Sequence, residues 1–121
     1  MSRNLATVTS IHPYTDAASL GTSLATIVSA PATGKVRKIE SIIVSNVDGT
    51  NDADVNVTLN LDGGDYYIAK TVTVPADSTL VVLSSDNPLY LRASYDTIRA
   101  SASATSDLQI LVSYQEITTS A

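Results

Sequence analysis

The chain has 121 residues, which fits one domain, and its 12 acidic and seven basic side chains give a net charge of −5. This charge excludes a broad phosphate-binding surface for nucleic acid, and the lack of cysteine excludes disulfides and thiolate metal sites. Apolar runs fall short of the roughly 18 residues that cross a bilayer, and the first residues lack the apolar block of a secretory signal. We therefore expect neither a membrane protein nor general secretion.

Charged residues are scarce, at 16% of the chain against roughly 25% in ordinary soluble domains. A β-rich composition, in which Ser, Thr and Asn supply the polar positions, explains this depletion. A surface that largely contacts other protein explains it equally well, because interface cores are depleted of charge. Both explanations stay open at this point.

Residues 1–21 are expected to form an extended N-terminal arm. Polar and turn-forming residues interrupt the apolar positions too often for a long regular element, although residues 5–11 could form a short strand. An arm of this kind is either a tail or a strap that lies on a neighbouring protein.

Residues 22–121 are expected to form one β-sandwich domain. Residues 22–30 predict its first strand, which ends at a turn containing Pro31 and Gly34. The β-branched run that follows, through Val47, predicts a central strand. Its three consecutive apolar residues at 42–44 indicate burial on both faces or a bulge.

Residues 54–74 predict a β-hairpin. Val55, Val57, Leu59 and Leu61 alternate with polar residues, as in a strand that is buried on one face. The segment 62–65, Asp-Gly-Gly-Asp, predicts the tight turn. The second run, 66–74, places Ile68, Val72 and Val74 on one side.

Four further runs follow, at residues 79–84, 89–95, 98–102 and 108–117. In the last run Leu108, Ile110, Val112 and Tyr114 alternate with more polar residues. About seven or eight short strands with regular turn signals and no sustained helical periodicity predict an all-β fold, an antiparallel sandwich or jelly roll.

No constellation of residues indicates catalysis, so an enzyme is not expected. The single histidine, His12, precedes a proline in the predicted arm, and the nucleophile-elbow, phosphate-loop and dinucleotide motifs are missing. Asp48, Asn51, Asp52 and Asp54 offer oxygen ligands for calcium, but their spacing is not that of an EF-hand, and the alternative is a solvated turn. We expect no cofactor and no metal.

All six aromatic residues are tyrosines, and Tyr66 and Tyr67 beside the hairpin turn could stack on sugar or anchor a protein interface. Adjacent strand residues point to opposite faces, so only one of these two rings could serve a sugar site.

Six short stretches carry a resemblance to a known class of proteins. They are Ser-Ala-Pro-Ala-Thr-Gly-Lys at 29–35, Ile-Glu-Ser-Ile-Ile-Val-Ser-Asn at 39–46, Leu-Asp-Gly-Gly-Asp-Tyr-Tyr-Ile-Ala-Lys at 61–70, Val-Pro-Ala-Asp-Ser-Thr-Leu at 74–80, Leu-Arg-Ala-Ser at 91–94 and Val-Ser-Tyr-Gln-Glu-Ile at 112–117. With these, residues 27–117 resemble small virion proteins of tailed bacteriophages, including phages of cyanobacteria. The stretches mark turns and strand ends and carry no chemistry.

The resemblance implies a non-enzymatic capsid decoration (cement) protein, often a homotrimer, that stabilises the shell by bridging subunits of the major capsid protein. It implies a place in the virion after assembly in the host cytoplasm, with virion proteins as partners. A tail, neck or baseplate component and a receptor- or glycan-binding β-module are the alternatives. The arm would be the strap, and the candidate interface residues are Leu5, Val8, Ile11, Tyr14, Tyr66 and Tyr67.

Overall fold

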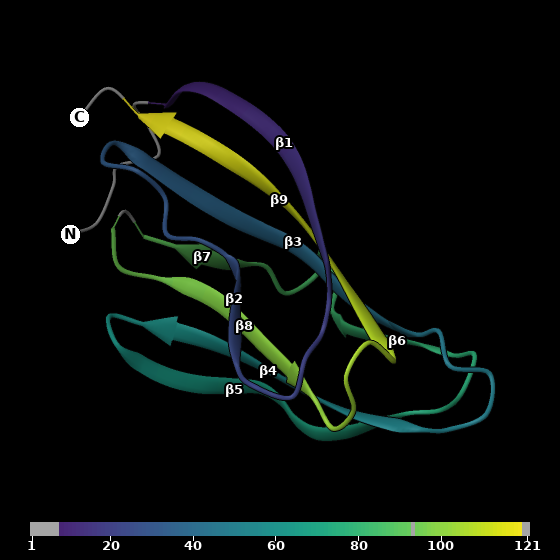
Figure 1. The fold of residues 1–121 in the computed structure, drawn as a ribbon. Helices are drawn as coiled ribbons and strands as arrows, with labels where there is room; N and C mark the ends of the chain where they lie inside the picture. Colours follow the sequence, from purple (N-terminus) through teal and green to yellow (C-terminus); the bar gives the residue numbers. More distant parts are fainter. Residues whose placement is uncertain (1–7, 93, 120–121) are drawn as a thin grey trace.

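The computed structural model describes residues 8–92 and 94–119, which form two antiparallel β-sheets packed face to face (Figure 1). This confirms the predicted all-β sandwich. The described strands are β1 (Val8–Ser19), β2 (Ala25–Val28), β3 (Lys35–Asn46), β4 (Ala53–Leu61), β5 (Gly64–Val74), β6 (Thr79–Leu83), β7 (Leu89–Leu91), β8 (Thr97–Ala102) and β9 (Leu108–Thr119). Within this part of the chain, no helix is long and apolar enough to cross a membrane.

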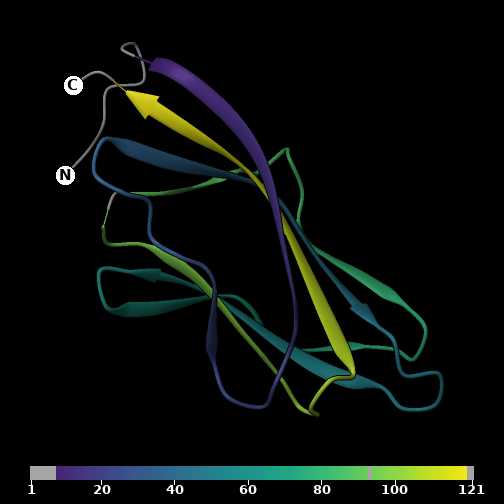
Figure 2. The ribbon, with the colours of Figure 1, turned by 45° about the horizontal axis from the view of Figure 1, so that its top comes forward.

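One sheet has the order β1-β9-β3-β6, with β7 pairing the first half of β3, and the other has the order β2-β8-β4-β5. Figure 2 shows the two layers from a second direction, with β1 (purple) at the edge of the first sheet and β9 (yellow) beside it. Strands β1 and β9 are far apart in sequence, yet they pair along 11 residue positions.

The core fills the space between the two sheets, because alternate residues of each central strand point inward. Strand β9 buries Leu108, Ile110, Val112 and Tyr114, as the alternation predicts. Strand β3 of the same sheet adds Ile39, Ile42 and Val44. Strands β4 and β8 of the second sheet supply the opposing apolar side chains, which include Val55, Val57, Ile98 and Ala100. None of the fully buried core residues belongs to β1.

The predicted hairpin is formed by β4 and β5, and its turn consists of Asp62 and Gly63. Both residues have positive φ, at 50° and 95°, which is the type I′ geometry that suits the twist of the flanking strands. The side chain of Asn60 accepts a hydrogen bond from the Gly63 amide at 3.0 Å and closes the turn.

The second strand of the hairpin departs from the expected simple alternation. Two register shifts, between Val55 and Val57 and between Val57 and Thr58 on the β4 side, insert extra residues into β5. As a result Ala69 is the buried residue at this point, whereas Ile68 and Val72 are half-buried.

A bulge precedes the apolar run in β3. The register with β9 shifts between Ile39 and Ser41, so Glu40 is the extra residue. Beyond it, Ile42 and Val44 point into the core and Ile43 lies on the outer face, and the run is therefore not buried on both faces.

Two strands are shorter than predicted. Residues 22–30 contain only β2, of four residues, and the run at 89–95 contains only β7, of three residues. Strand β7 ends just before Arg92, whose backbone amide and side chain both donate hydrogen bonds to the Asp96 carboxylate. Ser94, which lies between these two residues, has a φ of 65°.

The expectation that residues 1–21 contain no long regular element is wrong, because residues 8–19 form the 12-residue strand β1 of the first sheet. Residues 1–7, with Leu5, lie outside the described residues. Leu20 follows β1 and belongs to the core, where its amide donates to the Leu108 carbonyl at 2.8 Å. The separation of residues 1–21 from residues 22–121 as a functional unit stays a prediction.

Candidate interaction surfaces

Strand β1 forms one lateral edge of the first sheet and carries three of the candidate interface residues. Ile11 is 52% exposed, Tyr14 is 46% exposed and Val8 is also exposed. Tyr14 faces Tyr114 across the ladder, and the two rings stack with their centroids 5.6 Å apart. One side of Tyr14 therefore packs on the protein and the other lies open at the edge.

A polar cluster ties β1 to the neighbouring strands. The Tyr114 hydroxyl donates to a carboxylate oxygen of Asp16 at 2.9 Å. Burial of the phenol, reinforced by this hydrogen bond, raises the pKa of Tyr114 to about 12. The guanidinium of Arg37 lies over the Tyr114 ring, 5.1 Å from its centroid.

The same guanidinium connects three elements. Arg37 donates to the Glu116 carboxylate at 3.2 Å and to the carbonyl of Ser29, after β2, at 2.9 Å. Lys35 lies 3.7 Å from the second oxygen of Glu116, which is itself a buried carboxylate. Because the charged groups are paired with one another, the cluster suits holding strands in place rather than proton transfer.

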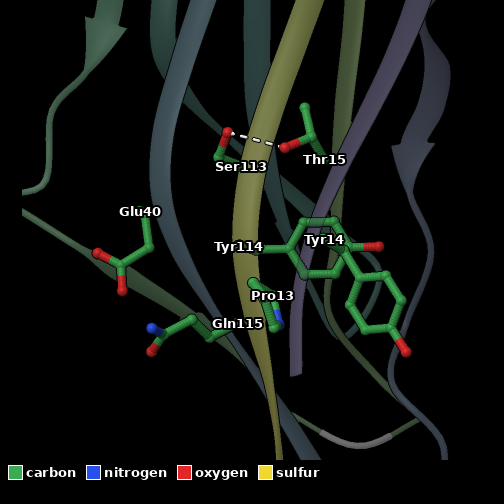
Figure 3. A pocket seen from close by; sticks show the side chains of 7 residues that line it. All are labelled: Pro13, Tyr14, Thr15, Glu40, Ser113, Tyr114 and Gln115. Atoms are coloured by element: carbon green, nitrogen blue, oxygen red, sulfur yellow. Dashed lines mark hydrogen bonds between the residues drawn. The ribbon is translucent and has the colours of Figure 1, made fainter. Parts of the chain in front are cut away.

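Two shallow grooves follow the line between β1 and β9. One, of about 280 Å³, is lined by Pro13, Thr15, Glu40, Ser113 and Gln115 together with the stacked tyrosines (Figure 3). Thr15 and Ser113 share a hydrogen bond of 3.2 Å there. The other, of about 320 Å³, is lined by residues 17–19, Gln109 and Leu111. These linings offer contact area and hydrogen bonds, and they hold no base beside a nucleophile.

Tyr66 and Tyr67, the other candidate interface residues, lie on β5 and are 61% and 54% exposed. The ammonium of Lys70 lies 5.2 Å from the centre of the Tyr67 ring. Strand β5 is at the far edge of the second sheet, beside β6, whereas β1 lies beside β2. The structure therefore places the two groups of candidates on opposite sides of the sandwich.

The aspartates between β3 and β4 serve the loop itself. Asp48 accepts hydrogen bonds from the amides of Thr50 at 2.8 Å and Asn51 at 3.2 Å, and these bonds lower the pKa of its carboxyl. Asp52 accepts from the Ala76 amide, and Asp54 from the Thr73 hydroxyl. The described residues contain no group of three or more acidic or histidine side chains that could hold a metal ion.

Among the described residues, the structure exposes four further large hydrophobic side chains: Val47, Val81, Tyr90 and Tyr95. In residues 89–95 the sequence alternates Leu89, Leu91 and Ala93 with Tyr90, Arg92 and Ser94, which predicts that Tyr90 lies on the polar face. Val81 lies within the uninterrupted run Leu80–Leu83, where the sequence gives no way to tell the two faces apart.

Comparisons with known proteins show the fold. The chain matches no protein-family model and no curated sequence. Among solved structures it is similar to a Bacillus endospore appendage from a family of disulfide-linked pili, with a TM-score of 0.53, 16% identity, and 94% of this chain and 90% of that chain covered. A chain from the acid-stable capsid of Helicobacter pylori bacteriophage KHP30 matches with a TM-score of 0.50 and 6% identity, covering 91% of this chain and 89% of that one.

A third similar structure, from infectious bursal disease virus, has a TM-score of 0.47 and 14% identity, and covers 93% of this chain but 33% of that chain. The structural neighbours thus include a phage capsid chain and a pilus protein. At identities of 6% and 16%, the likeness to these two shows a shared β-sandwich fold.

Proposed function

We propose that this protein is a non-enzymatic structural component of a bacteriophage particle, and specifically a capsid decoration (cement) protein that bridges subunits of the major capsid protein. The observation that carries the proposal is the match to the KHP30 capsid chain. That match covers nearly all of both chains, so the two have similar lengths and the likeness extends over a whole small capsid chain. The resemblance of residues 27–117 to small phage virion proteins supports the same setting.

The surface also supports a role in assembly. The grooves beside β1 are shallow and nearly uncharged, and the Glu40 carboxylate at one of them lies 3.4 Å from the Lys38 ammonium. A neutral polar surface with exposed aromatic side chains suits contact with protein, where charges are costly to desolvate. A protein bound across shell subunits stabilises the shell, because expansion must then break additional interfaces.

Copy number in the virion tests the proposal. Purified particles imaged by cryo-electron microscopy are expected to show this protein spread over the shell in hundreds of copies, as trimers. Incubation of the purified protein with shells that lack it is expected to restore binding and to raise the temperature at which the shells break. Copies confined to a ring or a tube along the tail would contradict the proposal.

A tail, neck or baseplate component is the second candidate. The similarity to a pilus subunit favours it, because that protein uses the same sandwich in a filament. This candidate predicts that the copies lie along the tail axis. Their number would be between a few and about a dozen, or a multiple of such a number. Titrating particles with an antibody that labels each copy distinguishes it from decoration.

A glycan-binding module is the third candidate, favoured by the exposed rings of Tyr66 and Tyr67. It predicts binding on a glycan array that is lost on Tyr66→Ala or Tyr67→Ala. Binding to no glycan across the array would remove this candidate.

A further inference from the structure

The edge strands of the two sheets differ in how strongly they resist pairing with a further strand. Strand β2 has four residues and β7 has three, and β6 has five with a register shift. Strand β5 is long but contains two register shifts. Short and bulged edges are the usual devices that prevent pairing with a further strand.

Strand β1 lacks these devices over most of its length. It has 12 residues, and its only register shift lies at the start, between Val8 and Ser10. From Ser10 to Ser19 it runs without interruption opposite β9. Among the described strands, β1 therefore presents the one long regular edge.

Two backbone hydrogen bonds show which groups of β1 face that edge. The Leu20 amide donates to the backbone carbonyl of Leu108 in the β1–β9 ladder, and the Val47 amide donates to the backbone carbonyl of Asp107 on the other side of β9. Even-numbered residues of β1 and β9 therefore bond to each other. By the alternation of an antiparallel ladder, the odd-numbered residues of β1 from Ile11 to Ser19 direct their amides and carbonyls to the open edge.

Pro13 is one of these odd-numbered residues, so its missing N–H removes no bond to β9. It does remove one donor from the open edge and thereby limits the registers that a second strand can adopt. If two β1 strands met with Pro13 opposite Pro13, neither residue could donate at that pair.

A register centred on Tyr14 avoids this pairing and brings complementary groups together. It sets His12 opposite Asp16 of the other strand, Ile11 opposite Ala17, and Pro13 opposite Thr15, whose N–H faces the Pro13 carbonyl. Odd residues meet odd residues, so the free backbone groups align. Even residues form the non-bonded pairs, with Cα atoms only about 4.5 Å apart, and their side chains lie on the core-facing side.

From this complementarity we infer that the open edge of β1 pairs with β1 of a second copy, antiparallel about a two-fold axis at Tyr14, which joins the first sheets of two molecules. Tyr14 then meets Tyr14 of the second copy, and the stack that Tyr14 makes with Tyr114 at 5.6 Å continues across the axis. The imidazole of His12 meets the carboxylate of Asp16 of the second copy twice. Such an isologous contact is closed, because the same edge serves both molecules.

The pairing uses one edge and leaves the rest of each molecule free for other contacts, including a trimer. One strand pair buries less area than a standard interface, so the association is weak in dilute solution and strengthens where copies are held close together. The inference does not depend on the proposed function.

Disulfide trapping tests the register, since the chain contains no cysteine of its own. In the proposed pair, His12→Cys lies opposite Asp16→Cys, within the Cα separation that a disulfide spans. When both copies carry the same substitution, the two cysteines lie four residues apart along the paired strands. Their separation of about 13 Å is too long for a disulfide. We expect an oxidised equimolar mixture of the two variants to give a disulfide-linked heterodimer of twice 12.7 kDa on a denaturing gel, and each variant alone to give no cross-linked dimer.

Equal cross-linking in the mixture and in the single variants, or none in either at high protein concentration, would overturn the inference. A cross-link between one chain with Thr15→Cys and another with Ser113→Cys would also overturn it, because it would show that β1 leaves its own β9 and pairs with that of another copy.

Proline substitution tests the hydrogen bonds without cysteine. Thr15→Pro removes an amide that faces the open edge, so we expect it to abolish the dimer in sedimentation equilibrium. Thr15→Val keeps the amide and is expected to dimerise like the unmodified chain. The melting temperature of each variant reports whether it is folded. A folded Thr15→Pro variant that still dimerises would contradict the pairing.

Discussion

Strands β1 and β5 are both long and lie at edges of the sandwich, but they are built differently. Strand β5 contributes Ala69 and Val74 to the core, and its edge is broken by two bulges, with Thr71 held at a φ of 51°. Strand β1 contributes no fully buried residue, and its edge is nearly regular. One edge strand therefore belongs to the core and is shielded from further pairing, while the other adds little to the core and stays open.

The difference indicates which parts of the molecule can change partners. A strand that carries core side chains cannot move without exposing them, whereas β1 is held by its ladder with β9 and by the cluster around Tyr114. The following experiments test this contrast, from the largest expected effect to the smallest.

The same substitution on the two strands should give very different results. Ala69→Asp places an unpaired carboxylate beside Val57 in the core, and we expect it to lower the free energy of unfolding by about 4 kcal/mol. Ala17→Asp on β1 places the same group in solvent and should cost less than about 0.5 kcal/mol. Urea denaturation of both variants measures this, and similar losses would show that β1 matters to the core as much as β5 does.

Removal of β1 should leave a folded domain. We expect deletion of residues 1–19 to cost about 2–4 kcal/mol, through the lost ladder with β9, while core amides of β4 and β8 stay protected from hydrogen exchange. Deletion of residues 1–20 also removes Leu20 from the core and should cost about 2–3 kcal/mol more. General loss of protection in the shorter deletion would mean that β1 is part of the core fold.

The bulge in β5 depends on one side chain of β4. The side-chain amide oxygen of Asn56 accepts a hydrogen bond from the backbone amide of Thr71 at 2.8 Å, where β5 departs from the regular ladder. We expect Asn56→Ala to cost about 1–2 kcal/mol in thermal unfolding, with Asn56→Asp retaining most of the stability because it keeps the acceptor. An unchanged melting temperature for Asn56→Ala would mean that the bulge persists without this hydrogen bond.

The hydroxyl of Tyr114 fixes β1 through Asp16, and Tyr114→Phe should cost about 1 kcal/mol near neutral pH. In the folded protein the pKa of Tyr114 is raised to about 12 from its ordinary value of 10, so its stabilising contribution is complete below pH 10 and is lost as the pH rises to 12. The two proteins should therefore approach equal stability over this range, and the phenylalanine variant should become the more stable one at its upper end. Parallel stability curves between pH 10 and 12 would contradict this.

The sequence predicted those parts of the fold in which neighbouring residues determine the outcome. The hairpin at Asp62–Gly63 follows from turn residues, and the buried face of β9 follows from strict alternation. The bulges in β3 and β5 depend on cross-strand fit, and alternation within one strand does not reveal them. The early end of β7 depends on Asp96, whose carboxylate is used by Arg92.

The contacts around β1 could not be predicted from the sequence, for a different reason. Asp16 and Tyr114 are 98 positions apart and meet only because β1 pairs with β9. Composition indicated surfaces poor in charge. Five of the candidate interface residues lie exposed in the structure: Val8, Ile11, Tyr14, Tyr66 and Tyr67. Predicting that these residues divide between two opposite edges requires the order of strands in the sheets, and the residue pattern within one strand does not contain that order.

Val8 and Thr119 are ladder partners, so the polypeptide enters and leaves the described sandwich at the same pole (Figure 1). A circularly permuted gene could connect these positions with a short linker and open the chain at the tip between Asp62 and Gly63. Every strand pairing would persist in such a protein. Cargo fused to the new ends would then project beside β4 and β5, away from the β1 edge.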